Sequence, residues 1–303
     1  MLRVVVPTLN AAAIWPRFAS SLKACVTPDH IVVIDSQSND GTAELARSSG
    51  FEVHSIPRGE FNHGTTRQKA AEMLSDADIL IYLTQDAILA SDDAVSRLLV
   101  AFEDPQVAVA YGRQLPREGA SAIEAHARVF NYPDKSCIRG IEARHTLGFK
   151  TIFVSNSFAA YRRTALMEVG GFPQNIIFGE DTVTVARALL TGYKVAYVAD
   201  ASVYHSHSYS WSQEFKRYFD IGVLHHKESW LLNAFGGASG EGGRYFVSEL
   251  NYLLRENRSE IPSAMIRTAL KYGGYKLGRI ENRLPVRAKL RMSMNRSYWN
   301  TSR

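Results

Sequence analysis

The sequence predicts an α/β fold with a mainly parallel sheet, followed by a mostly helical region. Over the first ~115 residues, apolar runs rich in Val and Ile alternate with helix-like segments, a pattern typical of strands joined by helices on both faces. The run Ile31–Ile34 is apolar at every position, as in a strand that is buried on both sides. After His207 the pattern changes, because Trp211, Phe215 and Phe219 recur at the spacing of one helix face.

The elements expected in the first part follow one another in order. The strands are expected at Arg3–Pro7, Ile31–Asp35, Glu52–Ile56, Ile79–Thr84 and Val107–Gly112. The helices between them are expected at Trp15–Ala24, Thr42–Ser48 and Thr65–Ser75.

The next segment, residues 116–150, is mixed and carries several Lys and Arg, which indicates an insertion or a loop over the sheet. After residue 150, the alternation of strand-like and helix-like patterns returns. We expect strands at Thr151–Asn156 and Lys194–Tyr204, and helices at Arg163–Val169 and Thr182–Leu190 that each stop at a following Gly.

We expect two domains, residues 1–212 and residues 213–303. The second is read as helical, apart from a flexible break at Gly236–Gly243 whose role stays open, either a mobile lid or a passive linker. Its last part is strongly basic, since residues 261–303 hold ten Lys or Arg and a single acidic residue, Glu281. Such a tail suits a membrane surface, a nucleic acid or merely a solvated helix face.

Composition excludes several classes of protein. With only Cys25 and Cys137, a disulfide scaffold and a cysteine metal site are excluded, and a reducing cytoplasm fits. No apolar run reaches the ~18 residues of a membrane span, and the first residues read as a strand rather than a signal peptide. The sequence has neither a G-x-G-x-x-G nor a G-x-x-x-x-G-K-[ST] motif, which disfavours a dinucleotide-binding dehydrogenase and a P-loop kinase.

Polar residues directly follow two of the expected strands. Asp35 ends the run Ile31–Ile34, and Thr84-Gln85-Asp86 ends the fourth strand. In a parallel α/β sheet, ligands bind beyond the carboxyl ends of the strands, and the helix from Thr42 offers free N–H groups there. An ordinary loop in which Asp40 only caps that helix is the alternative.

Five motifs appear in order along residues 1–215, and together they carry a family resemblance. They are Pro7-Thr8-Leu9-Asn10, Asp35-Ser36, Thr84-Gln85-Asp86, Gly179-Glu180-Asp181 and His205-Ser206-His207. This order resembles the family 2 glycosyltransferases of the GT-A fold, which have a nucleotide-binding Asp, a metal-binding Asp, an acidic base and a late His. The resemblance implies transfer of a sugar from a nucleotide diphosphate to a hydroxyl group.

Three short motifs narrow the resemblance. Thr84–Ala87, Gly59–Gly64 and His205–His207 together look most like bacterial rhamnosyltransferases of this family. That likeness implies dTDP-L-rhamnose as the donor and an acceptor saccharide, or lipid-linked oligosaccharide, of a bacterial surface polysaccharide such as O-antigen.

The resemblance assigns the nucleotide sugar to the strand ends and to one helix. The residues expected to contact it are Pro7, Thr8, Asn10, Asp35, Ser36, Arg67, Gln85 and Asp86. Arg67, near a helix N-terminus, would offer a phosphate a charge-assisted hydrogen bond. A surface salt bridge is the alternative for this residue.

A metal site is expected from Asp86, His205 and His207, with Mg²⁺ or Mn²⁺ bound. The family pattern is Asp-x-Asp, whereas this chain supplies one carboxylate at that place, so a late His would complete the site. An imidazole ligand favours Mn²⁺ over Mg²⁺. The alternative is a strand end with a buried neutral histidine.

Asp181 is expected, by resemblance, to be the general base of an inverting displacement, with Glu180 orienting the acceptor or bonding the backbone. Bound phosphates would raise the pKa of such a carboxylate towards the working pH. The alternative is that both acids only cap the helix Thr182–Leu190.

Two other functions stay open. The same fold could use a UDP-hexose or UDP-galactofuranose, and the chain could instead be a non-catalytic polysaccharide- or nucleic-acid-binding protein. Nucleic acid is disfavoured because residues 1–260 are net acidic. We expect a cytoplasmic enzyme held by its basic C-terminal region on the inner face of the plasma membrane. The oligomeric state cannot be predicted.

Overall fold

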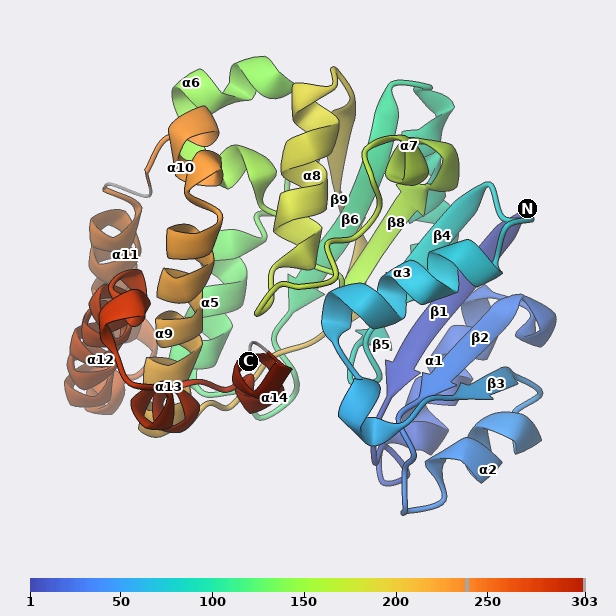
Figure 1. The fold of residues 1–303 in the computed structure, drawn as a ribbon, viewed down its shortest axis with the longest axis horizontal. Coiled ribbons are helices and arrows are strands. Elements are labelled where there is room, and N and C mark those ends of the chain that lie inside the picture. Colours follow the sequence, from blue (N-terminus) through green and yellow to red (C-terminus); the bar gives the residue numbers. More distant parts are fainter. Residues whose placement is uncertain (238–239, 302–303) are drawn as a thin grey trace.

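A computed structural model describes residues 1–237 and 240–301, which form a mixed sheet with helices on both faces and a cluster of helices at one end (Figure 1). The strands are β1 (Leu2–Thr8), β2 (Ile31–Asp35), β3 (Glu52–Ser55), β4 (Ile79–Leu83), β5 (Ile88–Leu89), β6 (Val107–Leu115), β7 (Cys137–Arg139), β8 (Phe158–Arg162) and β9 (Lys194–Tyr204). The helices are α1 (Trp15–Cys25), α2 (Thr42–Ser48), α3 (His63–Met73), α4 (Ala94–Leu99), α5 (Ala122–Asn131), α6 (Arg144–Leu147), α7 (Arg163–Glu168), α8 (Glu180–Leu190), α9 (Trp211–Lys227), α10 (Ser229–Phe235), α11 (Glu241–Glu256), α12 (Ile261–Arg279), α13 (Val286–Met292) and α14 (Arg296–Thr301).

The strand order is β3-β2-β1-β4-β8-β6-β9-β5, with β7 also paired to β9. β1 is parallel to β2 and β4, β2 is parallel to β3, and β9 is parallel to β6. β8 lies between β4 and β6 and is antiparallel to both. The strands β3, β2, β1, β4, β6 and β9 therefore all run in one direction, which confirms the expected mainly parallel α/β sheet.

The sheet is buried on both faces because successive residues of each strand point to opposite sides. Val4 and Val6 of β1 pack into one core with α1, whereas Val5 packs into the other with α3 and α8. All five residues of β2 are buried. Burial of this kind explains why these strands read as unbroken apolar runs.

The expected strand at Thr151–Asn156 is wrong. Thr151 and Ile152 close a 3-10 turn, and the strand β8 begins only at Phe158. The cause is visible at Asn156, whose backbone N–H donates to Asp181 and whose side chain donates to Glu180, instead of joining the sheet. This segment is therefore a loop that is hydrogen-bonded to the start of α8, and not a strand.

Residues 116–150 are more ordered than the expected loop. They hold α5, β7 and α6, and Ser121 caps α5 by accepting a hydrogen bond from the backbone N–H of Glu124. The strand β7 adds to the sheet at β9. The helix α5 of this segment packs against α11 (Figure 1).

The C-terminal region is helical, as expected. A capping box of Ser210 and Gln213 starts α9, which places Phe219 and Val223 in the same core as the sheet. Figure 1 shows α9 between the sheet and the outer helices α11 and α12. The expected domain boundary at residue 212 lies at the start of α9 and stays a prediction. Of the expected break Gly236–Gly243, residues 238–239 lie outside the described part, and the expectation is wrong for residues 241–243, which form the first turn of α11.

α9 and α12 pack closely because glycines line their contact. A Cβ on Gly278 would lie 2.1 Å from the carbonyl oxygen of Phe219, and one on Gly274 would lie 2.4 Å from that of Phe215. Among the described residues, no helix combines the length and the apolar character needed to cross a membrane.

Candidate active site

The loops that follow β1 and β2 lie together at the carboxyl edge of the sheet and are fixed by buried side chains. The Asp35 carboxylate accepts hydrogen bonds from the hydroxyl of Ser38 (2.6 Å), from its backbone N–H (2.9 Å) and from the hydroxyl of Thr8 (3.2 Å). Asp35 is only 2 % exposed. Its neighbour Ser36 is also buried and its hydroxyl has no partner within the protein, so it is available to a ligand.

Gln85 and Asn10 tie these loops to each other. The Gln85 side chain accepts from the backbone N–H of Leu9 (2.8 Å) and donates to the carbonyl of the same residue (3.1 Å). Asn10 accepts from the N–H of Asn39 at 3.1 Å, across to the loop after β2. The structure therefore brings Pro7, Thr8, Asn10, Asp35, Ser36 and Gln85 to one edge, next to Asp86.

Arg67 lies elsewhere, in the interior. It is 4 % exposed, and its guanidinium donates to Glu180 at 2.5 Å and contacts the ring of His63 at 3.2 Å. The alternative of a surface salt bridge is wrong, because the pair with Glu180 is buried, while the expected contact with a phosphate stays a prediction. In the protein alone, the charge of Arg67 is committed to a buried acid.

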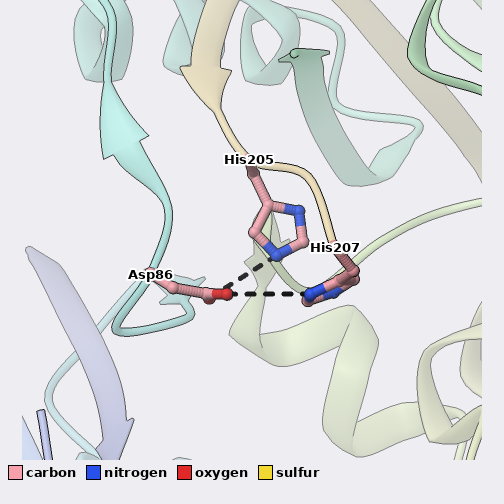
Figure 2. Close-up of side chains that lie close together, drawn as sticks. All are labelled: Asp86, His205 and His207. Atoms are coloured by element: carbon pink, nitrogen blue, oxygen red, sulfur yellow. Dashed lines mark ion pairs between the residues drawn. The ribbon is translucent and has the colours of Figure 1, made fainter. Parts of the chain in front are cut away.

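Asp86 converges with the two late histidines just beyond the end of β9, as Figure 2 shows. The carboxylate oxygens of Asp86 lie 3.5 Å from Nε2 of His205 and 3.9 Å from Nδ1 of His207. One ligand atom from each residue falls within 4.8 Å of the others. A carboxylate oxygen and two imidazole nitrogens at this spacing form a donor set that suits a divalent ion such as Mn²⁺.

The charges at this cluster favour an ionised acid beside a neutral imidazole. Burial would raise the pKa of Asp86, but its interactions with His205 and His207 outweigh burial and leave the pKa well below its usual range. Burial, together with the nearby His205, lowers the pKa of His207 to about 3. At neutral pH His207 is therefore uncharged, and a neutral imidazole can offer one ring nitrogen to a metal.

The start of α8 carries the two acids of the Gly179-Glu180-Asp181 motif in different surroundings. Gly179 has φ +78°, and a Cβ there would lie 2.8 Å from a methyl of Leu224, so the turn needs glycine. Glu180 is 5 % exposed and accepts from Arg67 and, at 3.1 Å, from the side chain of Asn156. Burial would raise the pKa of Glu180, but the charge of Arg67 outweighs burial and lowers it.

Asp181 is partly exposed, unlike Glu180. Its carboxylate accepts from the backbone N–H of Thr182 at 2.7 Å and from that of Asn156 at 3.2 Å. Burial and then the negative charge of Glu180 raise the pKa of Asp181 to about 6. A carboxylate with such a pKa, open on one side, suits proton abstraction near neutral pH.

Ser155 and Asn156 connect the acids to the metal cluster. Asn156 contacts both Glu180 and Asp181, while the hydroxyl of its neighbour Ser155 accepts a hydrogen bond from Gln114 (2.9 Å). Gln114 in turn lies 2.9 Å from Nδ1 of His205. Two consecutive residues before β8 thus reach the two halves of the site.

A cavity of about 400 Å³ opens beside α8. Thr182, which bonds Asp181, forms part of its wall together with the rings of Phe149 and Phe153. Three cations, Arg144, Lys150 and Arg244, stand against one acid in the lining, Glu241. Aromatic faces and spare positive charge suit a sugar that carries an anionic group.

Sequence reasoning missed three residues of this site, Gln114, Ser155 and Asn156, and it also missed the contact of His63 with Arg67. Gln114 is near the end of β6, so the rule that ligands gather at strand ends would have found it. Ser155 and Asn156 precede an antiparallel strand, and that rule does not cover them.

Comparison with known proteins identifies the family. The model of "Glycosyl transferase family 2" matches residues 3–170. The chain belongs to glycosyl transferase family 2. It is 45% identical, over 98% of its length and 95% of the relative, to the O-antigen chain rhamnosyltransferase RfbN of Salmonella typhimurium. It is 44% identical, with the same coverage, to the O-antigen chain rhamnosyltransferase WbaN of Salmonella anatum.

Solved structures agree on the fold of this glycosyltransferase. The mannosyltransferase PcManGT from Pyrobaculum calidifontis, in complex with GDP-Man and Mn²⁺, superposes with a TM-score of 0.60 at 17% identity. The match covers 99% of this chain and 88% of that one. TarS 1–349 of S. aureus matches with a TM-score of 0.53 at 14% identity, covering 99% and 89% of the two chains. The expected GT-A fold is confirmed, and a nucleotide-sugar donor follows from the family.

Proposed function

We propose that this glycosyltransferase moves L-rhamnose from dTDP-L-rhamnose to a saccharide hydroxyl during O-antigen synthesis, with inversion at the anomeric carbon. The observation that carries the proposal is the 45% identity, over almost the whole chain, to an O-antigen chain rhamnosyltransferase. The donor base and the inversion rest on the resemblance of the motifs, and the experiment below tests the base.

The nucleotide sugar binds, in this proposal, at the edge formed by Pro7, Thr8, Asn10, Asp35, Ser36 and Gln85. The free hydroxyl of Ser36 supports this placement, because a buried hydroxyl without a partner is costly unless a ligand satisfies it. Asp86, His205 and His207 would hold Mn²⁺ or Mg²⁺. A divalent ion there would neutralise the charge of the diphosphate as it leaves.

Asp181 acts as the general base in the proposal. It takes the proton of the acceptor hydroxyl as the acceptor oxygen bonds to the anomeric carbon and the bond from that carbon to the diphosphate breaks. The hydrogen bonds from Asn156 and Thr182 hold the carboxylate in place for this step. Glu180, committed to Arg67, keeps a negative charge beside Asp181 and so raises its proton affinity.

The acceptor binds, we infer, in the cavity beside Thr182. Its wall includes Thr182, the residue after Asp181, which supports this assignment, and its aromatic rings would pack against a sugar face. Lys150 and Arg244 both pair with Glu241. Among the described residues, Arg144 donates only to the backbone carbonyl of Ala234. Arg144 would therefore meet a negative charge on the acceptor, as on a lipid-linked saccharide.

Calorimetric titration tests the donor. Titration with dTDP and with UDP, each with and without Mn²⁺, should show tight binding of dTDP only when the metal is present. Asp86→Ala should then remove the metal dependence of dTDP binding. A preference for UDP would overturn the rhamnosyl donor while leaving the mechanism, and metal-independent binding would overturn the metal site.

The C-terminal region contacts an anionic membrane, we further propose, through the outer face of α12. The side chains of Met265, Ile266 and Tyr272 are 56%, 41% and 66% exposed on that face, while Gly274 and Gly278 face α9. An exposed apolar stripe on a helix whose opposite side already packs against the protein is typical of a surface that contacts lipid or another protein. Exposed cations lie on the helix and at both of its ends, at Arg255, Arg258, Lys276, Arg283 and Arg287.

The cations favour an anionic bilayer over a second protein as the occupant, since each one near such a surface contributes about 1 kcal/mol. Not every basic residue of the tail is available, because Arg267 and Lys271 pair with Glu214, and Lys289 pairs with Glu281. The proposed membrane contact therefore involves fewer basic residues than the composition of the tail alone indicates.

Sedimentation with vesicles tests this contact. The protein should sediment with phosphatidylglycerol vesicles and not with phosphatidylcholine vesicles. Ile266→Ser combined with Tyr272→Ser should weaken partitioning by at least about 100-fold, since each buried apolar side chain contributes about 1.5–3 kcal/mol and each 1.4 kcal/mol is about a tenfold change. Val100→Ser, at an apolar residue that is 58% exposed and lies outside the C-terminal region, is the matched control. Unchanged sedimentation of the double variant would overturn the proposal.

A further inference from the structure

We propose that Gln114 is a positioning residue that orients His205 and fixes which of its ring nitrogens is free to bind the metal. The inference deepens the metal role proposed above for His205 and rests on it. It starts from the contacts of one buried amide, which is 2 % exposed near the end of β6.

The orientation of the Gln114 amide is determined by its partners. The guanidinium of Arg128 contacts Oε1 of Gln114, and because arginine can only donate, that atom must be the oxygen. The amide nitrogen then donates to the hydroxyl of Ser155 at 2.9 Å. The two ends of the amide are thus held from α5 and from the segment before β8.

The same oxygen lies 2.9 Å from Nδ1 of His205, and an oxygen can only accept there, so Nδ1 must carry a hydrogen. His205 is 3 % exposed, which leaves its ring little contact with solvent. The other nitrogen, Nε2, faces the carboxylate of Asp86 at 3.5 Å. When Nε2 carries no proton, Nε2 and the carboxylate oxygen of Asp86 face each other with lone pairs. A cation between these two atoms would be bound by both.

The arrangement thus presents Nε2 as the ligand atom and holds the ring plane from behind. Arg128 adds to this, because its positive charge beside the shared oxygen keeps the amide from turning its nitrogen towards His205. Hydrogen bonds of this kind to a metal-bound histidine typically change metal affinity by about 10- to 100-fold.

Two variants separate the hydrogen bond from mere packing. Gln114→Leu removes the acceptor and should raise the Kd for Mn²⁺, measured by calorimetry, by about 10- to 100-fold. Gln114→Glu keeps an oxygen at the same place and should bind Mn²⁺ nearly as the parent protein does. Gln114→Asn, which withdraws the oxygen but keeps the chemical group, should weaken Mn²⁺ binding and serves if the leucine variant does not fold.

Gln68→Leu is the matched control. Gln68 is another buried glutamine, 6 % exposed, that accepts from the backbone N–H of Phe172 and lies outside the metal cluster. Its loss should lower the melting temperature without changing the Kd for Mn²⁺.

A spectroscopic readout needs no metal. Long-range ¹H–¹⁵N spectra of the metal-free protein, labelled at histidine and assigned with His205→Gln, should show a hydrogen on Nδ1 of His205. In Gln114→Leu that hydrogen should move to Nε2, where Asp86 accepts it. A bare Nδ1 in the parent protein would overturn the inference, and so would Mn²⁺ binding that is unaffected by both Gln114→Leu and Gln114→Asn. Absence of Mn²⁺ binding in the parent protein would instead refute the metal site itself.

Discussion

The guanidinium of Arg67 and the carboxylate of Glu180 form a buried ion pair, 2.5 Å apart, that joins α3 to α8. Both side chains are about 5–6% exposed, so neither charge has much access to water. The pair places a permanent negative charge one residue before Asp181. It also fixes the start of α8 against a helix that lies 113 residues earlier in the chain.

Replacement of Arg67 should be strongly destabilising. Arg67→Met leaves Glu180 buried without a counter-charge, and the loss of one partner of such a pair typically costs about 3–5 kcal/mol. Urea unfolding measures this. Arg67→Met combined with Glu180→Leu should recover most of the loss, and Arg97→Gln, which breaks an exposed pair with Asp93, should leave stability unchanged. A loss in the single variant no larger than in Arg97→Gln would contradict the prediction.

Asp181→Asn should abolish sugar transfer while leaving the nucleotide bound. A positioned general base contributes about 10²–10⁴-fold to the rate, and the amide cannot take the proton. The turnover rate and the calorimetric Kd for dTDP with Mn²⁺ should be measured on the same sample. Turnover near that of the parent protein would rule out Asp181 as the base.

Activity should fall as pH drops through about 6, because burial and Glu180 raise the pKa of Asp181 to about 6 and the base works only when ionised. Below that pH, kcat/KM should decline about tenfold per unit. In Glu180→Gln the neighbouring charge is gone, so the acid limb should move to lower pH. An acid limb that stays in place in this variant would mean that another group controls it.

The raised pKa also affects stability, with a definite sign. The folded protein holds the proton of Asp181 more tightly than the unfolded chain does, so this group stabilises the fold at low pH. That contribution is lost as pH rises from about 4, the pKa of an unperturbed Asp, to about 6. Asp181→Asn should remove this part of the pH dependence of unfolding.

Chelation should stop the reaction, and Mn²⁺ should restore it. Asp86→Ala and His205→Ala should raise the Kd for Mn²⁺ by more than about 100-fold, beyond the effect of a residue that only supports a ligand. His207→Ala tests whether the second imidazole is also a ligand. His54→Ala, a half-exposed histidine on β3, is the control, and equal losses in it and in His205→Ala would contradict the site.

Two glycines of α12 should respond in opposite ways to alanine. Gly278→Ala places a Cβ against the backbone of α9 and should destabilise the protein by about 1–3 kcal/mol. Gly273→Ala has nothing within 4 Å and should instead stabilise it by about 0.5–1 kcal/mol through helix propensity. Thermal melts of both variants decide, and a shift of the same sign in both would show that the helices are not in close contact.

Much of this site was predictable, because most of it follows parallel strands. Asp35 and Asp86 end buried strands, and the carboxyl ends of such strands meet at one edge whatever their separation in sequence. His205 and His207 follow the same logic at β9. The apolar pattern of these runs predicts strands of one sheet, and the family resemblance assigns the nucleotide, the metal and the base to the residues at their ends.

The other residues of the site could be predicted only from the order and direction of the strands in the sheet. β8 runs against its neighbours, so the residues at the functional edge are those before it, Ser155 and Asn156, and not those after it. The partner of Arg67 depends on α3 and α8 covering the same face, which no local pattern encodes. From sequence, Glu180 is expected to orient the acceptor or bond the backbone, with helix capping as the alternative. Its pairing with Arg67 is missed because no local pattern connects two residues 113 positions apart.

The glycine contact between α9 and α12 links the outer surface of the molecule to its chemistry. α9 begins four residues after His207, and backbone rather than side chains meets α12, so the two helices have little freedom to slide. If α12 lies on the bilayer, the metal-site edge of the sheet stands at a fixed height above the lipid. The enzyme would then select those acceptors whose reacting hydroxyl lies at this distance from the membrane surface.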